Sequence, residues 1–161
     1  MDKNINGNIL TSNGLNSGEG KEREQRPHTV YLSLGSNLGD RQGTISAAIK
    51  KINELIGDVV RQSTLIETEP WGFDSENKFL NGCVCVETDL SPRELLEMTQ
   101  IIEQELGRKE KSHDEQYHDR PIDIDILLYD DITVDEPDLR IPHPHMHERD
   151  FVMRPLKEIK Q

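Results

Sequence analysis

One stretch of the chain shows a strict alternation of apolar and acidic residues. Between positions 120 and 128, isoleucines at 122, 124 and 126 alternate with Asp123 and Asp125. A period of two is typical of a β-strand that rests one face on a hydrophobic core. We therefore expect a strand whose isoleucines are buried and whose two carboxylates project from the opposite face, about 6.6 Å apart at the usual rise per residue.

Similar patterns predict the other elements. Apolar alternation indicates three further strands, over residues 29–34, 59–67 and 79–88. Apolar residues three and four apart indicate one helix capped by Asp40 and ending at Gly57. They indicate a second helix that starts with a capping box at Ser91 and ends at Gly107. Gln100 and Glu103, three apart, are expected to share the side of this helix opposite its apolar residues. A short hairpin over roughly residues 132–141 and a last helical turn near residues 148–159 follow.

This order predicts an α+β fold with a ferredoxin-like β-α-β-β-α-β core. The sheet is expected to be antiparallel, with both helices on one face and the active site on the other, and the hairpin and short helix are added at the C-terminal end. Alternation then puts Phe79, Asn81, Asp123 and Asp125 together on the uncovered face. A face with this mixture of aromatic, amide and carboxylate side chains is suited to form the floor of a binding site.

Length and composition limit the possible classes. The 161 residues suffice for one domain, predicted over 28–161, after a disordered N-terminal extension over 1–27 that is rich in Asn, Gly, Ser and Glu. A net charge of −12 argues against nucleic acid as a partner, and no apolar run is long enough for a membrane span. Cys83 and Cys85 are expected to be reduced thiols of a cytoplasmic protein.

The paired carboxylates have two interpretations. Oxygen ligands suit Mg²⁺, which usually takes one or two carboxylates and fills its remaining positions with water and substrate phosphates. Alternatively, Asp123 and Asp125 are solvated side chains of an ordinary half-exposed strand. The spacing by itself leaves both open.

Six motifs along the chain bear on this choice. In order they are Gly35-Ser36-Asn37-Leu38, Thr68-x-Pro70-x-Gly72, Phe79-Leu80-Asn81, Gly107-Arg108, Arg120-x-x-Asp123-Ile124-Asp125-Ile126, and Pro142-His143-Pro144 with Arg149-x-Phe151. Together they resemble the 6-hydroxymethyl-7,8-dihydropterin pyrophosphokinases of folate biosynthesis. The resemblance extends from residue 29 to about residue 158. It implies a monomeric enzyme that acts on two small molecules and transfers pyrophosphate from ATP to the pterin hydroxymethyl group.

The resemblance also implies roles for individual residues. Asp123 and Asp125 would hold two Mg²⁺ ions, and they are expected to act in catalysis together with Arg108 and Arg120. The positions that match the family's ATP site are Gln100, Glu103, Arg108, Arg120, Ile126, His143 and Arg149. The positions that match its pterin site are Thr68, Pro70, Phe79, Asn81, Tyr117 and Phe151.

The chain departs from the family around one loop. Tyr117 stands where the family usually has Trp, His118-Asp119 replaces Gly-Pro, and the loop between Gly107 and Arg120 is about two residues longer and more acidic than usual.

Three other classes share some of these features. An RNA-recognition module has the same element order, but it stacks bases on aromatic residues of its first and third strands and is rarely so acidic. A metal-dependent nucleotidyl or glycosyl transferase would use the Asp pair without needing Asn81 or Phe151. A small-molecule sensor that had lost the chemistry would not need Arg120 beside the two aspartates.

Overall fold

The computed structural model describes residues 27–70, 75–107 and 119–161. Its elements are β2 (His28–Ser36), α1 (Arg41–Leu55), β3 (Gly57–Gln62), β4 (Ile66–Thr68), β5 (Phe79–Thr88), α2 (Pro92–Glu105), β6 (Asp123–Tyr129), β7 (Val134–Glu136), β8 (Leu139–Ile141), the 3-10 turn η2 (Met146–Glu148) and α3 (Asp150–Ile159). The predicted N-terminal extension lies outside the described residues, except for Pro27, and so do Arg108 and Tyr117.

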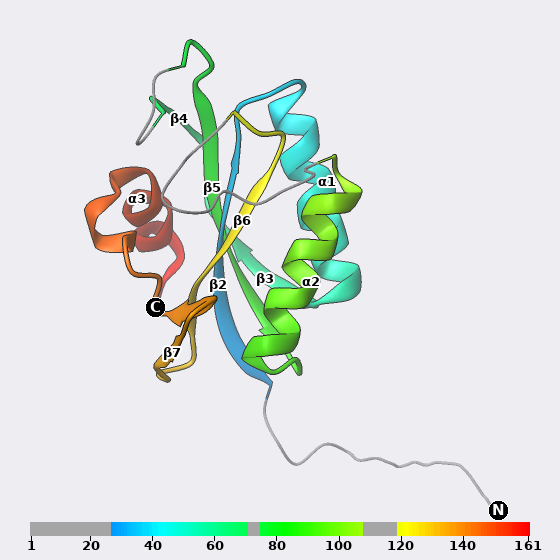
Figure 1. Ribbon diagram of the computed structural model, residues 1–161, viewed down its shortest axis with the longest axis vertical. Coiled ribbons are helices and arrows are strands. Elements are labelled where there is room, and N and C mark those ends of the chain that lie inside the picture. The colour runs from blue at the N-terminus through cyan, green and yellow to red at the C-terminus, as the bar shows by residue number, and fades with distance from the viewer. Residues whose placement is uncertain (1–26, 71–74, 108–118) are drawn as a thin grey trace, which may run out of the picture.

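The sheet has the predicted ferredoxin-like arrangement. Its strands run in the order β3-β5-β2-β6, with every pairing antiparallel, and β7 and β8 form the separate hairpin. Figure 1 shows β2 and β5 in the middle of the molecule, with the hairpin near its lower end. The α+β prediction is confirmed, including the antiparallel sheet and the C-terminal hairpin and helix.

The strand predicted over 59–67 is instead two strands, because the chain leaves the ladder between them. β3 and β4 both pair with β5, at opposite ends of it. At the break, the Ser63 hydroxyl takes the place of a backbone partner and accepts from the Cys83 N–H at 2.9 Å. Leu65 then lies over Gly82, where an added Cβ would be 2.6 Å from a Leu65 methyl carbon. The pattern of apolar residues does not predict that a side chain will replace a backbone group as a hydrogen-bond partner.

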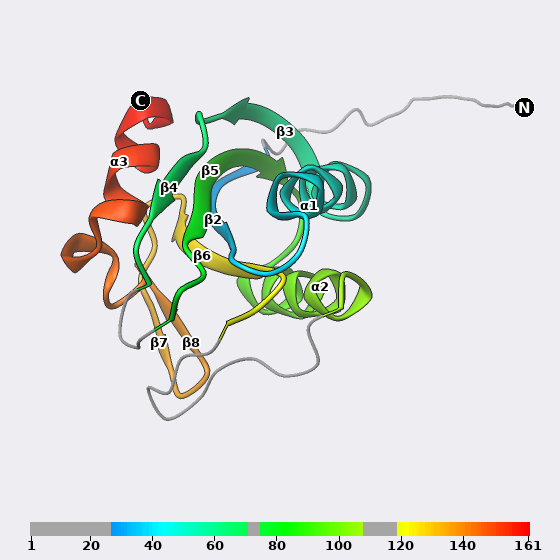
Figure 2. The ribbon, with the colours of Figure 1, turned by 90° about the horizontal axis from the view of Figure 1, so that it is seen from above.

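Both predicted helix starts are confirmed by their capping bonds. Asp40 caps α1 by accepting from the Gly43 N–H, while Ser91 and Glu94 form the reciprocal capping box of α2. α1 and α2 cover the same face of the sheet (Figures 1 and 2). Their apolar residues and those of the strands form the main core, which includes Val30, Leu32, Leu34, Ile45, Ile52, Val84, Val86, Leu95, Ile102, Ile122, Ile124 and Ile126. None of the helices in the described ranges is long and apolar enough to cross a membrane.

The second face of the sheet is only partly uncovered. α3 lies on the opposite side of the sheet from α1 and α2 (Figure 2), and it buries Val152, Leu156 and Ile159 against Tyr31, Cys83, Cys85 and Leu127. The expectation of a fully open face is therefore wrong for the end that α3 covers. A final helical turn was expected, but its sequence did not show which surface it would cover.

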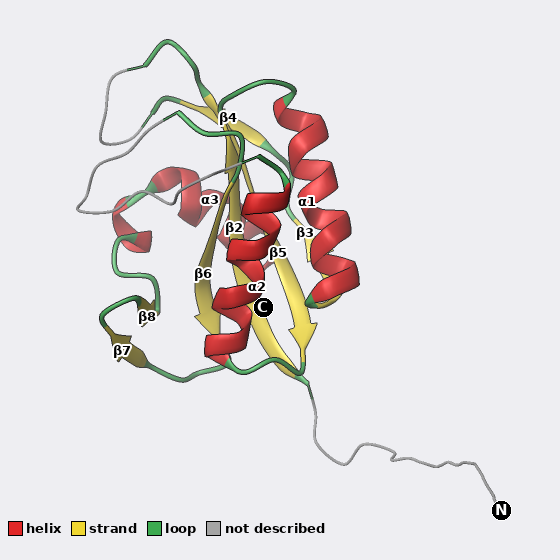
Figure 3. Cartoon of the chain, turned by 45° about the vertical axis from the view of Figure 1, so that its right-hand side comes forward, coloured by secondary structure: helices red, strands yellow, loops and turns green. Residues whose placement is uncertain are grey.

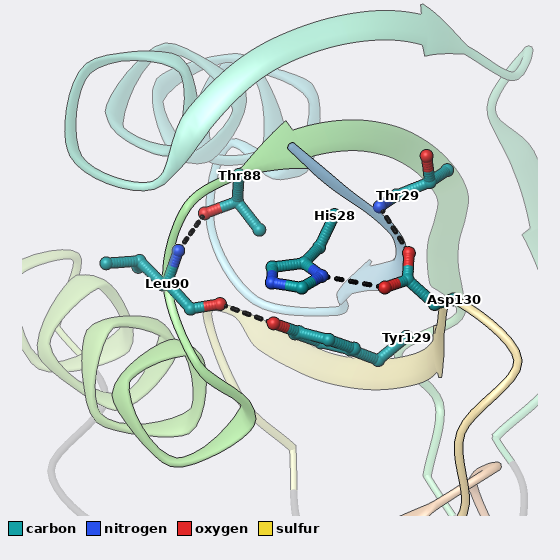
Figure 4. A network of polar contacts seen from close by, with 6 residues as sticks. All are labelled: His28, Thr29, Thr88, Leu90, Tyr129 and Asp130. Carbon is teal, nitrogen blue, oxygen red and sulfur yellow. Dashed lines mark hydrogen bonds and ion pairs between the residues drawn. The ribbon is translucent and has the colours of Figure 1, made fainter. Parts of the chain in front are cut away.

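A polar network joins the lower end of the sheet to α2 (Figure 4). His28 contacts Asp130 through Nδ1 and Oδ2 at 2.7 Å, and the Thr29 N–H donates to the other Asp130 oxygen at 2.8 Å. The Tyr129 hydroxyl donates to the Leu90 carbonyl, just before α2, at 2.7 Å. These contacts fix the start of β2 and the end of β6 together. The opposite ends of the same two strands, where Gly35 of β2 pairs with Asp123 of β6, lie toward the top of the molecule in Figure 3.

Candidate active site

Three strands place predicted site residues side by side on the second face. Gly35 of β2 pairs with Asn81 of β5 on one side and with Asp123 of β6 on the other. One step along, Ser33 pairs with Cys83 and with Asp125. Because side chains two apart share a face, the Asn and both carboxylates emerge from the same side. The predicted grouping of these residues is confirmed.

Arg120 contacts residues of both β5 and β6. Its guanidinium carbon lies 4.9 Å from the centre of the Phe79 ring, and its Nη2 lies 3.6 Å from an Asp123 carboxylate oxygen. The planar group can stack on an aromatic face and still point N–H donors at anions. Arg120 therefore brings positive charge to the site without leaving the aromatic wall.

The Asn81 side chain is buried and oriented by its neighbours. Its amide donates to the Thr68 hydroxyl of β4 at 2.5 Å. Gly35 leaves room for it, since a Cβ at that position would come within 2.9 Å of Asn81 Oδ1. A buried amide held in this way presents a fixed edge to a ligand.

A cavity of about 400 Å³ lies beside this row, between β6, α2 and the β7–β8 hairpin. Its lining includes three of the predicted residues, namely Asp125, Ile126 and His143. Its other walls are formed by Leu96, Ile124, Pro137, Asp138, Leu139, Arg140 and Pro144. The size suits a small ligand such as a nucleotide.

His143 faces several charged groups of the site. Burial is the largest cause that lowers the pKa of His143; the Asp125 and Asp123 charges oppose it, and the Arg149 charge adds to it. The ring is therefore neutral at pH 7 and above. Arg149 is buried and lies over the Phe151 ring at 5.7 Å. An ATP-site candidate and a pterin-site candidate thus contact each other.

Glu103 does not lie on the outer side of α2, where it was expected. It is 3% exposed, and its carboxylate accepts from the Ile124 N–H at 2.7 Å. Ile124 lies between the two aspartates, and its N–H points away from β2, to the side of β6 where the described residues form no further strand. A buried carboxylate needs donors of this kind. Residue spacing along the helix could not show that the edge of β6 would supply one.

Two predicted residues stand apart from these contacts. Gln100 is partly exposed on α2, and Pro70 is partly exposed just after β4. Neither lines the cavity of about 400 Å³. Arg108 and Tyr117 are outside the described residues.

Three polar residues near the site were missed from the sequence. Asn37, Asn77 and Asp119 bond to one another beside Arg120. Only Asn37 lay in a motif that the sequence singled out, as part of the turn after the first strand.

The two aspartates fit a magnesium site by their chemistry. Both are half-buried oxygen donors on one strand face. Within the described residues, no group of three or more His, Cys, Asp or Glu gathers to form a complete protein cage. Mg²⁺ needs no such cage, because water and substrate phosphates commonly complete its shell.

The amino-acid sequence also matches a known family. Residues 31–161 match the family described as 7,8-dihydro-6-hydroxymethylpterin-pyrophosphokinase (HPPK). The chain belongs to this family. A Porphyromonas gingivalis member, named 2-amino-4-hydroxy-6-hydroxymethyldihydropteridine pyrophosphokinase, is 51% identical over 131 residues, which cover 81% of this chain and 89% of that protein. An Aquifex aeolicus member with the same name is 44% identical over 132 residues, covering 82% and 80%.

Solved HPPK structures share the fold. A crystal structure of an HPPK-DHPS in complex with substrates superimposes with a TM-score of 0.67 at 14% identity, covering 84% of this chain. A Plasmodium falciparum HPPK-DHPS with pteroate gives a TM-score of 0.60 at 18% identity, covering 84% of this chain. The chain spans about two fifths of those longer proteins, 40% and 39% respectively. These likenesses support the architecture.

Proposed function

We propose that this chain transfers pyrophosphate from ATP to the hydroxymethyl group of 6-hydroxymethyl-7,8-dihydropterin in folate biosynthesis. Family membership and the names of relatives 51% and 44% identical support the proposal. The observation that carries it is the placement of Arg120, which touches both the aromatic wall at Phe79 and the carboxylate of Asp123. The Arg120 side chain thus lies against the proposed pterin wall and beside a proposed ligand of the metal ions that bind phosphate.

The proposed reaction forms one bond to phosphorus and breaks another. The hydroxymethyl oxygen bonds to the β-phosphorus of ATP, the bond from that phosphorus to the oxygen bridging the α-phosphate breaks, and AMP leaves while the hydroxyl proton is released. Asp123 and Asp125 would hold two Mg²⁺ ions that neutralise phosphate charge. The protein's own contribution is to hold both substrates in line and to surround the phosphates with fixed donors.

The cavity beside β6 is assigned to ATP. Ile126 would contact the adenine through its backbone, and Arg120 and Arg149 would bind phosphate oxygens through their planar guanidinium groups. His143, neutral at pH 7, can offer a ring N–H to a phosphate without a charge of its own. Gln100 and Arg108 complete the predicted set. Glu103 supports this site through Ile124 and is not proposed to touch ATP.

The pterin is assigned to the row that begins at Asn81. The oriented amide would bond to the donor and acceptor edge of the ring, with Thr68 as its support. Phe79 and Phe151 would provide the flat apolar walls on which an aromatic heterocycle stacks. Pro70 and Tyr117 complete the predicted pocket.

The enzyme is further proposed to act as a monomer in the cytoplasm. The two cysteines are free and buried, as expected for a protein of a reducing compartment. Light scattering at micromolar concentration measures the oligomeric state, and a dimer at that concentration would contradict this part of the proposal.

Identifying the products of the reaction tests the main proposal. AMP should accumulate only when ATP, Mg²⁺ and hydroxymethyldihydropterin are all present, and the pterin product should gain two phosphorus atoms by mass spectrometry. Reactions that lack one component serve as controls. Formation of ADP, or of AMP without the pterin, would exclude pyrophosphoryl transfer to this substrate.

A further inference from the structure

Asn37, which follows β2, is buried next to the site and is 3% exposed. Its backbone N–H donates to the Arg120 carbonyl at 3.1 Å, and its side-chain oxygen accepts from the Arg120 N–H at 2.7 Å. These two bonds extend the contact between β2 and the chain entering β6 beyond the last strand pair, Gly35 with Asp123. The backbone of Arg120 is therefore held from both of its polar groups.

The amide of the same side chain bonds to the residue before Arg120 and to one further segment. Its Nδ2 donates to Asp119 Oδ1 at 2.7 Å and to the Asn77 carbonyl at 3.2 Å. The Asn77 side chain in turn donates to Asp119 Oδ2 at 3.0 Å. Asn37, Asn77 and Asp119 are here named the Asn37 clasp. Along the chain, Asn77 is 40 residues and Asp119 is 82 residues away from Asn37.

The charge state of Asp119 suits this arrangement. Burial alone would raise the pKa of Asp119, but hydrogen bonds from Ser75, Asn37 and Asn77, together with the Arg120 charge, lower it below its ordinary value. The group is an ionised carboxylate at neutral pH, and both of its oxygens accept from an amide. Charge-assisted hydrogen bonds of this kind are stronger than neutral ones.

The clasp is bonded to the main chain of Arg120, the residue that joins the two proposed subsites. Asp119 precedes Arg120, whose guanidinium contacts Phe79 and Asp123, and Asn77 lies two positions before Phe79, the first residue of β5. The clasp thus holds the chain just before the arginine and just before the ring on which that arginine stacks.

We propose that the Asn37 clasp is a positioning device that aims the Arg120 guanidinium at the phosphates of ATP. The inference rests on the proposed function. Misplacement of a catalytic group by about 1 Å can cost about 100-fold in rate, so the clasp can matter to turnover without touching substrate.

Two substitutions test the clasp. In Asp119→Asn, one carboxylate oxygen becomes an NH2 group that must face the amide donor of Asn37 or of Asn77, so at least one bond is lost. Asn77→Ala removes a single bond at an exposed residue, where folding is not at risk. The matched controls are Glu105→Gln, which breaks an exposed ion pair with Lys51, and Asn53→Ala, which removes one exposed side-chain bond to the Val59 N–H.

The readouts separate positioning from a merely structural role. We expect Asp119→Asn to lower kcat/KM for ATP by about 10-fold to 100-fold, and Asn77→Ala by a smaller factor in the same direction. The dissociation constant for the pterin alone, measured by fluorescence titration, should stay within about twofold, since Asn81 and Phe79 are unchanged and the bonds removed are between side chains of the clasp itself. Both controls should match the unsubstituted chain.

Three results would overturn or redirect the inference. If the unsubstituted chain forms AMP while Asp119→Asn and Asn77→Ala behave like their controls, the clasp does not position Arg120. If pterin affinity and melting temperature fall in step with kcat/KM, the role is structural. Should Asp119→Asn fail to fold, Asn77→Ala decides alone. Absence of AMP from the unsubstituted chain would instead refute the proposed function.

Discussion

The sheet face opposite α1 and α2 is part of the hydrophobic core at one end and carries the candidate site at the other. At one end, Tyr31 and Cys85 of β2 and β5 are buried under Val152 and Leu156 of α3. At the other end, β5 presents Asn81 and β6 presents Asp123 and Asp125, on either side of β2. The alternation of side chains is continuous along β2 and β5, whereas the register of β6 against β2 shifts between Tyr31 and Leu32. What changes is whether a helix covers the strand.

The contrast shows how a continuous strand can serve both as core and as site. A buried carboxylate without partners costs more than the fold can offset, so the aspartates can occupy this face only where α3 does not reach. Cys83 and Asp125 flank Ser33 in one row and mark the boundary. Stability and activity should therefore respond separately to substitutions at the two ends.

The largest expected effect lies at the uncovered end. Asp125→Ala should lower turnover by about 100-fold to 1,000-fold or more, because a charge that stabilises the transferring phosphates is lost. Pterin affinity should change little, since Asn81 and Phe79 remain. AMP formation and pterin fluorescence measure the two quantities, with Asp58→Ala on the exposed edge of β3 as the control. Unchanged turnover would remove Asp125 from the proposed metal site.

The covered end should show the reverse pattern. Leu156→Ala removes a side chain that is 2% exposed and should lower the free energy of unfolding by about 2–5 kcal/mol. Activity at a temperature where the variant stays folded should be nearly unchanged. Urea unfolding provides the measurement, and Leu55→Ala, at a residue 40% exposed on α1, is the matched control. A large loss of turnover in the folded variant would mean that the two ends are coupled.

A smaller and more selective effect is expected at Gly35. In Gly35→Ala the new methyl group would press on Asn81 Oδ1, 2.9 Å away, and disturb its bond to Thr68. We expect the pterin dissociation constant to rise about 10-fold, as when one oriented polar contact is lost, while the affinity for a non-hydrolysable ATP analogue stays the same. Equal losses for both ligands would show that the row acts as one unit.

The smallest effect concerns the cysteines under α3. Burial, with a further contribution from Cys85, raises the pKa of Cys83 to about 12. At pH 8 only about one molecule in ten thousand carries the Cys83 thiolate, so this group should not react with a thiol reagent in the native protein. Labelling should become complete in urea. Leu156→Ala should accelerate native labelling by opening the covered end, and fast labelling of the unsubstituted protein would contradict burial of the thiol.

Alternating and helical patterns predicted most of the architecture because they depend on nearest neighbours. The strand predicted over 79–88 matches β5, Phe79–Thr88, and the caps at Asp40 and Ser91 form the expected bonds. The break between β3 and β4 was not predicted, since it depends on the Ser63 hydroxyl meeting a backbone group of β5. That contact joins residues 20 apart in the sequence.

The same distinction, between local sequence patterns and contacts from other elements, applies to the candidate site. Residues with a motif of their own, such as Asn81 and Asp123, were predicted to share a face and do so. The burial of Glu103 and the bonds of Asp119 depend on partners that come from other elements. Helical spacing placed Glu103 beside Gln100 on an outer surface, whereas its partner, the Ile124 N–H, lies on a strand 21 residues away.

The contact between Glu103 and Ile124 also bears on how these molecules behave when concentrated. Among the residues that the structure describes, β6 is an outer strand of the sheet, and free N–H groups on an outer strand can pair with a strand from another molecule. Glu103 already occupies one of those groups at 2.7 Å, and α2 runs alongside (Figure 3). A strand from another molecule would have to displace the Glu103 carboxylate from this N–H, which would leave a buried charge without that hydrogen bond. Among the described residues, Glu103 therefore disfavours pairing of another strand at Ile124, and the residue that supports the site also opposes self-association there.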